Sequence, residues 1–113
     1  MKEINQRIIK FFDALADETR LKILVTVSKG PMTVKDIHSS VGELTLSAIS
    51  HQLKMMAGLD IVKFEKKGRK KYYRLSDAYC WCPLRDAFSQ MNKKTKCPHC
   101  AELFEKGGNL IQD

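Results

Sequence analysis

The sequence predicts a mostly α-helical (α+β) domain, and three observations carry this prediction. The 113 residues are 43% hydrophobic and 29% charged, which suits one globular domain with a core of its own. Apolar residues recur at spacings of three and four through the first half of the chain, which is the period of helices with one buried face. Two β-prone runs then flank a glycine, which is typical of a hairpin.

The first two helices follow from spacing and stop signals. Residues 4–15 carry five apolar side chains at helical spacing, which predicts the first helix. This apolar stripe suits either core packing or a dimer surface, and spacing alone leaves both open. Asp17 begins a second helix, which stops before Gly30 and Pro31.

A short third helix and a longer fourth helix follow. Thr33 caps the third helix, residues 34–40, and Gly42 ends it and permits a tight turn. The fourth helix is expected from about residue 46 to residue 57, and Gly58 closes it. A short helix, a tight turn and a second helix form the helix-turn-helix layout, in which the second helix enters the DNA major groove.

The fourth helix has an apolar back and a small polar front. Thr45 is its expected N-cap, and Ile49, Leu53 and Met56 are its expected buried residues. The opposite face carries short or polar side chains, namely Ser47, Ser50, His51 and Lys54.

A basic hairpin follows. Strands are expected over residues 61–65 and 71–75, around a glycine-centred turn at residues 66–70. Residues 61–75 hold seven Lys or Arg against Glu65 alone, so +6 of the net charge of +7 lies in this segment. A hairpin directly after a helix-turn-helix is a wing, and its charge is the footprint expected for a polyanion.

Four segments in register give a resemblance to a known family. They are residues 14–24 (ALADETRLKIL), 44–54 (LTLSAISHQLK), 57–59 (AGL) and 68–75 (GRKKYYRL). Together they resemble the winged helix of the ArsR/SmtB family of repressors over about residues 12–75. The resemblance implies four helices, two strands and a fifth helix. It also implies a homodimer paired through the first and last helices, an imperfect palindromic DNA operator, and release of repression by an inducer.

The resemblance and the chemistry of the side chains together select the DNA-binding candidates. On the fourth helix these are Thr45, Leu46, Ser47, Ser50, His51 and Lys54. Gln52 is a weaker candidate, and Leu46 either touches a thymine methyl group or packs inward. On the wing, Lys67, Arg69 and Lys70 are expected to contact phosphates, with Arg69 suited to a narrow minor groove.

The usual sensor positions of the family lack metal ligands. Paired cysteines of the third helix would fall at Thr33 and Lys35, and none of the three histidines suits a site on the last helix.

The four cysteines instead lie in the last third of the chain. Cys80 and Cys82 form one close pair, and Cys97 and Cys100 form another after fourteen intervening residues. Two close pairs predict a tetrahedral zinc site, or a site for another thiophilic metal, in which His99 could replace one thiolate. A thiol-redox switch and unlinked structural cysteines are the alternatives.

The separation of the two pairs restricts how they meet. A helix opened by Pro83 and continuous to Cys97 would hold them ~22 Å apart at ~1.5 Å per residue. The pairs therefore meet either within one chain, by a fold-back near Asn92, or across the dimer. The within-chain site is slightly favoured.

These observations predict a cytoplasmic, homodimeric DNA-binding repressor with a metal-binding cysteine segment. Residues 1–79 would form the winged helix-turn-helix, and residues 80–113 the dimerisation helix and cysteine segment of the same domain. No stretch approaches the ~18 consecutive apolar residues of a membrane span. A winged helix used for protein contacts is an alternative function. A thiol oxidoreductase built on residues 97–100 is disfavoured, so no enzymatic activity is expected.

Overall fold

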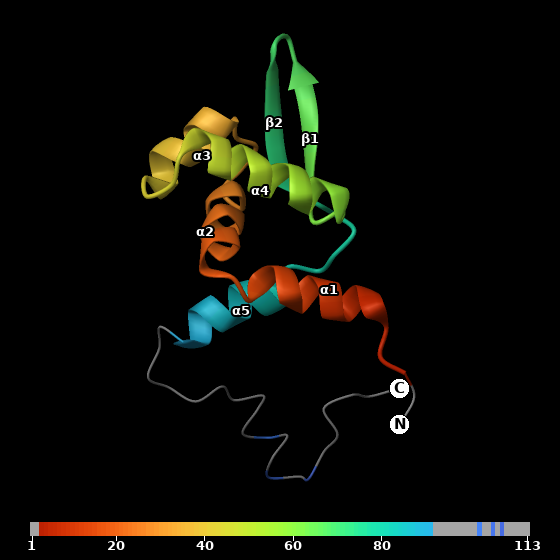
Figure 1. Cartoon of the computed structure of the whole chain (residues 1–113). Helices are drawn as coiled ribbons and strands as arrows, with labels where there is room; N and C mark the ends of the chain where they lie inside the picture. Colours follow the sequence, from red (N-terminus) through yellow and green to blue (C-terminus); the bar gives the residue numbers. More distant parts are fainter. Residues whose placement is uncertain (1–2, 92–101, 103–104, 106, 108–113) are drawn as a thin grey trace. The chain divides into compact units, whose positions relative to one another are not determined.

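The computed structural model describes residues 3–91, 102, 105 and 107, and within them it shows five helices and a two-stranded antiparallel sheet (Figure 1). The elements are α1 (Gln6–Leu15), α2 (Glu18–Val27), α3 (Val34–Val41), α4 (Leu46–Gly58), β1 (Val62–Lys67), β2 (Lys70–Leu75) and α5 (Cys82–Met91). This order confirms the predicted winged helix-turn-helix. Of the helices in these residues, none is long and apolar enough to cross a membrane.

The chain divides into two compact units, Met1–Tyr79 and Cys80–Asp113. The first unit contains α1 to α4 and the hairpin, and the second contains α5. The prediction that both belong to one domain stays a prediction.

Three helices of the first unit, α2, α3 and α4, begin where the sequence places their caps, whereas α1 begins at Gln6, two residues later than predicted, with Asn5 as its N-cap. Asp17, Thr33 and Thr45 each accept a hydrogen bond from the backbone N–H three residues later, at 2.9, 3.2 and 3.1 Å. At α3 the carboxylate of Asp36 also accepts from the backbone N–H of Thr33 at 3.2 Å, which completes a capping box. Hydrogen bonding with the Thr33 side chain and backbone holds the pKa of the Asp36 carboxyl below its usual value.

The end of α4 differs from the prediction. Gly58 is the last helical residue rather than the cap, and the left-handed position is Asp60, with φ of +59°. The N–H of Asp60 donates to the carbonyl of Ala57 at 3.0 Å, and the N–H of Ile61 donates to that of Met56 at 2.9 Å. These two bonds are the Schellman pattern, and a short polar Asp tolerates the left-handed conformation that usually favours glycine.

The core of the first unit lies among α2, α3, α4 and the base of the hairpin. Its members share complete burial, with 0% of each side chain exposed: Ile23, Leu24, Ile37, Ile49, Leu53, Met56 and Ile61. Three of them are the predicted apolar face of α4, which is thereby confirmed. Burying large apolar side chains contributes ~1.5–3 kcal/mol each, so this face fixes how α4 is rotated about its axis.

The hairpin is longer and its turn tighter than predicted. Its register runs from Val62 opposite Leu75 to Lys67 opposite Lys70, which leaves a two-residue turn of Gly68 and Arg69. The strands can extend into the lysine-rich run because these side chains are exposed and keep their charges in water. Gly68 has φ of +65°, as the first central residue of a tight hairpin turn requires.

A short bridge adds a third segment to the sheet. The N–H of Met32 donates to the carbonyl of Tyr73 at 2.9 Å, and the N–H of Tyr73 donates to the carbonyl of Met32 at 2.7 Å. The loop after α2 is thereby held against β2, a contact that sequence patterning does not reveal.

Two glycines provide a matched test of these backbone assignments. A Cβ added at Gly58 or at Gly68 meets no atom within 4 Å, so backbone conformation alone decides the outcome. Gly58→Ala should raise the free energy of unfolding by about 0.5–1 kcal/mol, because alanine favours the helix. Gly68→Ala should lower it by about 1–2 kcal/mol, because an L-residue is strained at positive φ. Urea unfolding measures both. Equal effects of the two changes would contradict the assigned ends of α4 and of the hairpin turn.

Candidate nucleic-acid interface and thiol pair

The outward face of α4 carries most of the predicted DNA-binding residues. Thr45, Ser47, His51 and Lys54 are exposed, and Ser50 is half-buried. Because the opposite face of the helix is fully buried, these side chains are presented together on one side. Short hydroxyls, an imidazole and an amine can donate hydrogen bonds to base edges or phosphates.

Two weaker candidates on α4 behave differently. Leu46 is 42% exposed, so it does not pack fully into the core and can offer an apolar contact at the surface. Gln52 is half-buried, and its Oε1 is buried with no hydrogen-bond partner in the part of the chain that the structure describes. The carbonyl of Gln52 therefore points inward, which gives a base-reading role no support.

The wing presents its charge mainly at the tip. Lys67, Arg69 and Lys70 are all exposed. Near the base, Lys63 Nζ is paired with the Asp77 carboxylate at 3.0 Å. Lys71 Nζ and Lys67 Nζ lie over aromatic rings, 4.5 Å from the centre of Phe64 and 5.8 Å from that of Tyr72, and such contacts leave their charges unneutralised. The tip is therefore the part of the wing best able to meet a phosphate backbone.

An ion-pair cluster that sequence patterning missed holds the turn before α4. Lys22 Nζ on α2 lies 2.8 Å from a carboxylate oxygen of Glu43 in the turn and 3.2 Å from one of Glu18. Hydrogen bonds with both carboxylates raise the pKa of Lys22, and the bond from Lys22 lowers the pKa of Glu43. The cluster is exposed and each pair contributes little stability, but together they link α2 to the start of α4.

Two exposed thiols begin the second unit. Hydrogen bonding from the backbone and side chain of Cys82 lowers the pKa of the Cys80 thiol, and the positive charge of Arg85 adds to this. The same interaction raises the pKa of Cys82, because a second thiolate beside the first is disfavoured. Since α5 begins at Cys82, the sulfur of Cys80 lies at a helix N-terminus, where a thiolate is favoured.

The predicted four-cysteine site is described only in part. Cys97, Cys100 and His99 lie outside the described residues, and so does the segment that would choose between a within-chain and a cross-dimer site. Among the residues that are described, no group of three or more possible metal ligands occurs. Cys80 and Cys82 are exposed neighbours, and their sulfurs fit a thiophilic ion as two ligands of a set.

Comparison with known proteins identifies the family. Residues 17–63, from the N-cap of α2 into β1, match the model of the bacterial regulatory proteins of the arsR family. The chain is 37% identical over 82 residues to a cadmium resistance regulator, the CadC homolog of Staphylococcus aureus, covering 72% of this chain and 67% of that one. The chain belongs to the ArsR family. This confirms the resemblance seen in the sequence, and the family and its relatives are regulators rather than enzymes, as expected.

Other relatives agree with this assignment. The chain is 35% identical over 72 residues to a transcriptional repressor, the SmtB homolog of Synechocystis, covering 64% of this chain but 54% of that one. It therefore spans only about half to two thirds of the curated relatives' lengths.

Solved structures agree as well. The antimony-specific repressor AntR superposes with a TM-score of 0.62 at 29% identity, covering 76% of this chain and 75% of that one. A homodimeric winged helix-turn-helix DNA-binding domain from Mycobacterium bovis, described as a possible ArsR-family regulator, gives 0.67 at 20% identity, covering 86% and 98%. The second likeness shows the fold alone.

The thiol pair yields a test of its own. Cys80 should react with iodoacetamide faster than Cys82 near neutral pH, because its lowered pKa leaves more of it as thiolate. Brief alkylation of the reduced, metal-free protein, with tandem mass spectrometry to locate the label, measures the ratio. Raising the pH should bring the two rates together. A faster Cys82 would show that the hydrogen bonding runs the other way.

Proposed function

We propose that this ArsR-family chain is a homodimeric, sequence-specific DNA-binding repressor whose C-terminal cysteines bind zinc or another thiophilic metal. The observation that carries the DNA-binding part is the pairing of two surfaces in one unit. The polar outward face of α4 precedes a hairpin whose tip holds Lys67, Arg69 and Lys70. The first surface suits base edges in a major groove, and the second suits phosphates.

The two surfaces divide the work of recognition. Cations of the wing displace counterions from DNA, which strengthens binding to any sequence and makes it depend on salt. Ser47, Ser50, His51 and Lys54 on α4 supply the groups that distinguish one base pair from another. Thr45 caps the helix, so its hydroxyl is engaged with the N–H of Ala48 and serves DNA binding by placing the helix start.

The exposed face of α1 supports the dimer. Four large apolar side chains are about half exposed along this helix and its start: Ile4, Ile8, Ile9 and Phe12. A second copy of the chain is the proposed occupant, because a repressor that reads a palindrome needs two recognition helices related by symmetry. The related mycobacterial domain is itself described as homodimeric.

The thiol pair supports the metal part of the proposal. Two adjacent, exposed sulfurs, one with a lowered pKa, are suited to a soft metal ion, and zinc in such a site would supply a fixed tetrahedral centre. Cys97 and Cys100 are the proposed remaining ligands. The relatives' names mention cadmium and antimony, which are also thiophilic. A redox switch at the same thiols is the alternative.

The two DNA-contact surfaces can be separated by mutation. Changing Lys67, Arg69 and Lys70 together to Ala should weaken binding to a selected operator and to random duplex alike, and should flatten the salt dependence by up to about three units of slope. Changing Ser50 and His51 to Ala should instead weaken operator binding selectively, because base contacts are lost. Fluorescence anisotropy over a salt series measures both.

A charge-preserving variant is the control for the wing. Exchanging Lys67 and Lys70 for Arg and Arg69 for Lys keeps all three charges, so the salt slope should stay at the wild-type value. If the triple Ala variant keeps that slope too, the wing does not contact phosphates. Equal losses on both duplexes from the Ser50 and His51 changes would mean that these residues only place the helix. Absence of any duplex binding would favour a protein-interaction module.

Metal content tests the cysteine site. Protein purified without chelator should contain about one zinc per chain by elemental analysis, and a Cys80→Ser, Cys82→Ser variant should lose it, because half of the ligand set is gone. Ser28→Ala is a neutral control, since within the described part of the chain that exposed hydroxyl bonds to the carbonyl of Val25, far along the sequence from the cysteines. Metal-free protein with fewer than four titratable thiols would refute the metal site and favour the redox alternative.

A further inference from the structure

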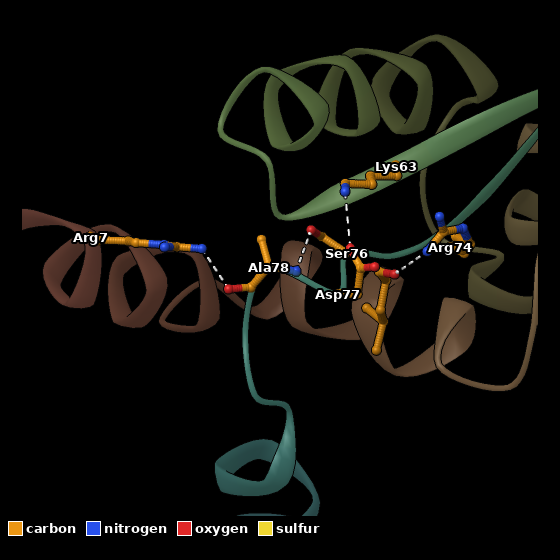
Figure 2. Close-up of polar contacts among 7 residues, drawn as sticks. Arg7, Lys63, Arg74, Ser76, Asp77 and Ala78 are labelled. Atoms are coloured by element: carbon orange, nitrogen blue, oxygen red, sulfur yellow. Dashed lines mark hydrogen bonds and ion pairs between the residues drawn. The ribbon is translucent and has the colours of Figure 1, made fainter.

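Four residues join β2 to the second unit and make contacts with α1, with β1 and with the end of α4. We call Ser76, Asp77, Ala78 and Tyr79 the strap. Ser76 is 1% exposed, and its N–H donates to the carbonyl of Ile61 at 3.0 Å. The hydroxyl oxygen of Ser76 accepts the N–H of Ala78 at 3.0 Å, which tightens the segment into a turn (Figure 2).

Cations from two other elements hold the middle of the strap. Lys63 on β1 reaches Asp77 at 3.0 Å, and this hydrogen bond lowers the pKa of the Asp77 carboxyl. The guanidinium of Arg7 on α1 donates to the carbonyl of Ala78, and Figure 2 shows it reaching across from that helix. The strap is thus tied to the wing by one side chain and to α1 by another.

Tyr79 connects α1 with the end of α4. Its ring stacks on Phe11 at 5.3 Å between centroids with 24° between the planes, and the Arg7 guanidinium lies 4.9 Å from its centre. Its hydroxyl donates to the carbonyl of Leu59 at 3.3 Å. Leu59 is the C-cap of α4, so this carbonyl belongs to the last turn, where carbonyls lack partners within the helix.

The contact of Tyr79 with α4 lies next to the thiol pair in the chain. Tyr79 directly precedes Cys80, the first thiol of the pair. Any ion that fixes Cys80 and Cys82 also fixes the backbone that leads into Tyr79. An aromatic ring with few rotamers passes a backbone shift to its contacts more directly than a flexible side chain does. The hydroxyl of the same side chain bonds to the C-cap of α4, the helix that carries the polar face.

We propose that the strap transmits metal binding at Cys80 and Cys82 to the C-terminal end of α4, with Tyr79 as the positioning residue. The inference rests on the proposed function, because it takes the thiol pair as the metal site and α4 as the DNA-reading helix. The strap would have two conformations. In the first, the Tyr79 hydroxyl is bonded to the Leu59 carbonyl, and in the second that hydroxyl is displaced from the carbonyl. Binding at the thiols biases this equilibrium, which is what coupling between two sites requires.

Hydrogen exchange on the full-length protein tests the route without DNA. Adding Zn²⁺ to metal-free wild type should change the exchange rates of the Leu59, Asp60 and Ile61 amides by about threefold or more, since all three N–H groups donate to carbonyls in the last turns of α4. In Tyr79→Phe, which keeps the stacked ring and loses only the hydroxyl, zinc should still bind with the same stoichiometry. The exchange rates of the three amides should then barely respond.

Two further variants keep the result interpretable. Ser28→Ala removes a hydroxyl-to-carbonyl bond at the end of α2, so its response to zinc should equal that of wild type. Arg7→Met removes the bond to the Ala78 carbonyl and should reduce the response partly. The inference is overturned if zinc does not change the exchange rates of the three amides in wild type. This includes the case in which wild type binds no zinc. The inference is equally overturned if Tyr79→Phe responds as wild type does.

Measurements of DNA binding distinguish a failure of the strap from a failure of the proposed DNA-binding function. The ratio of dissociation constants with and without Zn²⁺, measured on a duplex selected from a random pool, should fall within the 5–150-fold range usual for coupled sites. Tyr79→Phe should reduce that ratio to less than about a third while leaving zinc-free affinity near wild type. A wild type that binds no duplex refutes the proposed function, whereas exchange at residues 59–61 still decides the strap.

Discussion

Burial of one face of α4 is the constraint on which the rest of the structure depends. Ile49, Leu53 and Met56 have no exposed surface, and their helix packs against α3 and β1. Rotating the helix by one residue, ~100°, would expose this face and bury charged or polar groups. The outward direction of Ser47, His51 and Lys54 is therefore a consequence of core packing. Packing of the buried face, rather than contacts made by these side chains themselves, sets the direction in which they point.

The same core places the wing. Ile61 is buried directly after the Schellman end of α4, so the chain leaves the helix and enters β1 along a fixed path. The Met32 bridge then fixes β2 from the other side. Between them, these contacts hold a hairpin whose outer part has little apolar burial and carries mainly charge. Such an arm is suited to a charged partner because its cations stay solvated until phosphates replace the water.

Local structure can be predicted from the sequence where one local rule acts alone. Thr33 and Thr45 were found because a hydroxyl before a helix has a single strong use, and the α4 face was found because burial follows the helical period. Such prediction fails where local rules compete. Gly58 is a plausible terminator, but three-dimensional hydrogen bonding placed the left-handed residue at Asp60. Contacts between distant residues, such as Lys22 with Glu43 and Tyr79 with Leu59, leave no periodic signal and needed the structure.

The division of the chain at Tyr79 bears on how a regulator of this kind can respond to a ligand. A thiol pair within the first unit would have to deform a closely packed core, which resists small displacements. In the proposed arrangement the pair lies just beyond this core, next to a segment whose contacts include the Arg7 bond to the Ala78 carbonyl, the Lys63–Asp77 ion pair and the stacking of Tyr79 on Phe11. An exposed ion pair or a single hydrogen bond contributes little free energy, so losing one of them does not by itself unfold the unit. Under the proposed function, the core would keep the polar face of α4 in place while the strap changes how the end of that helix is held.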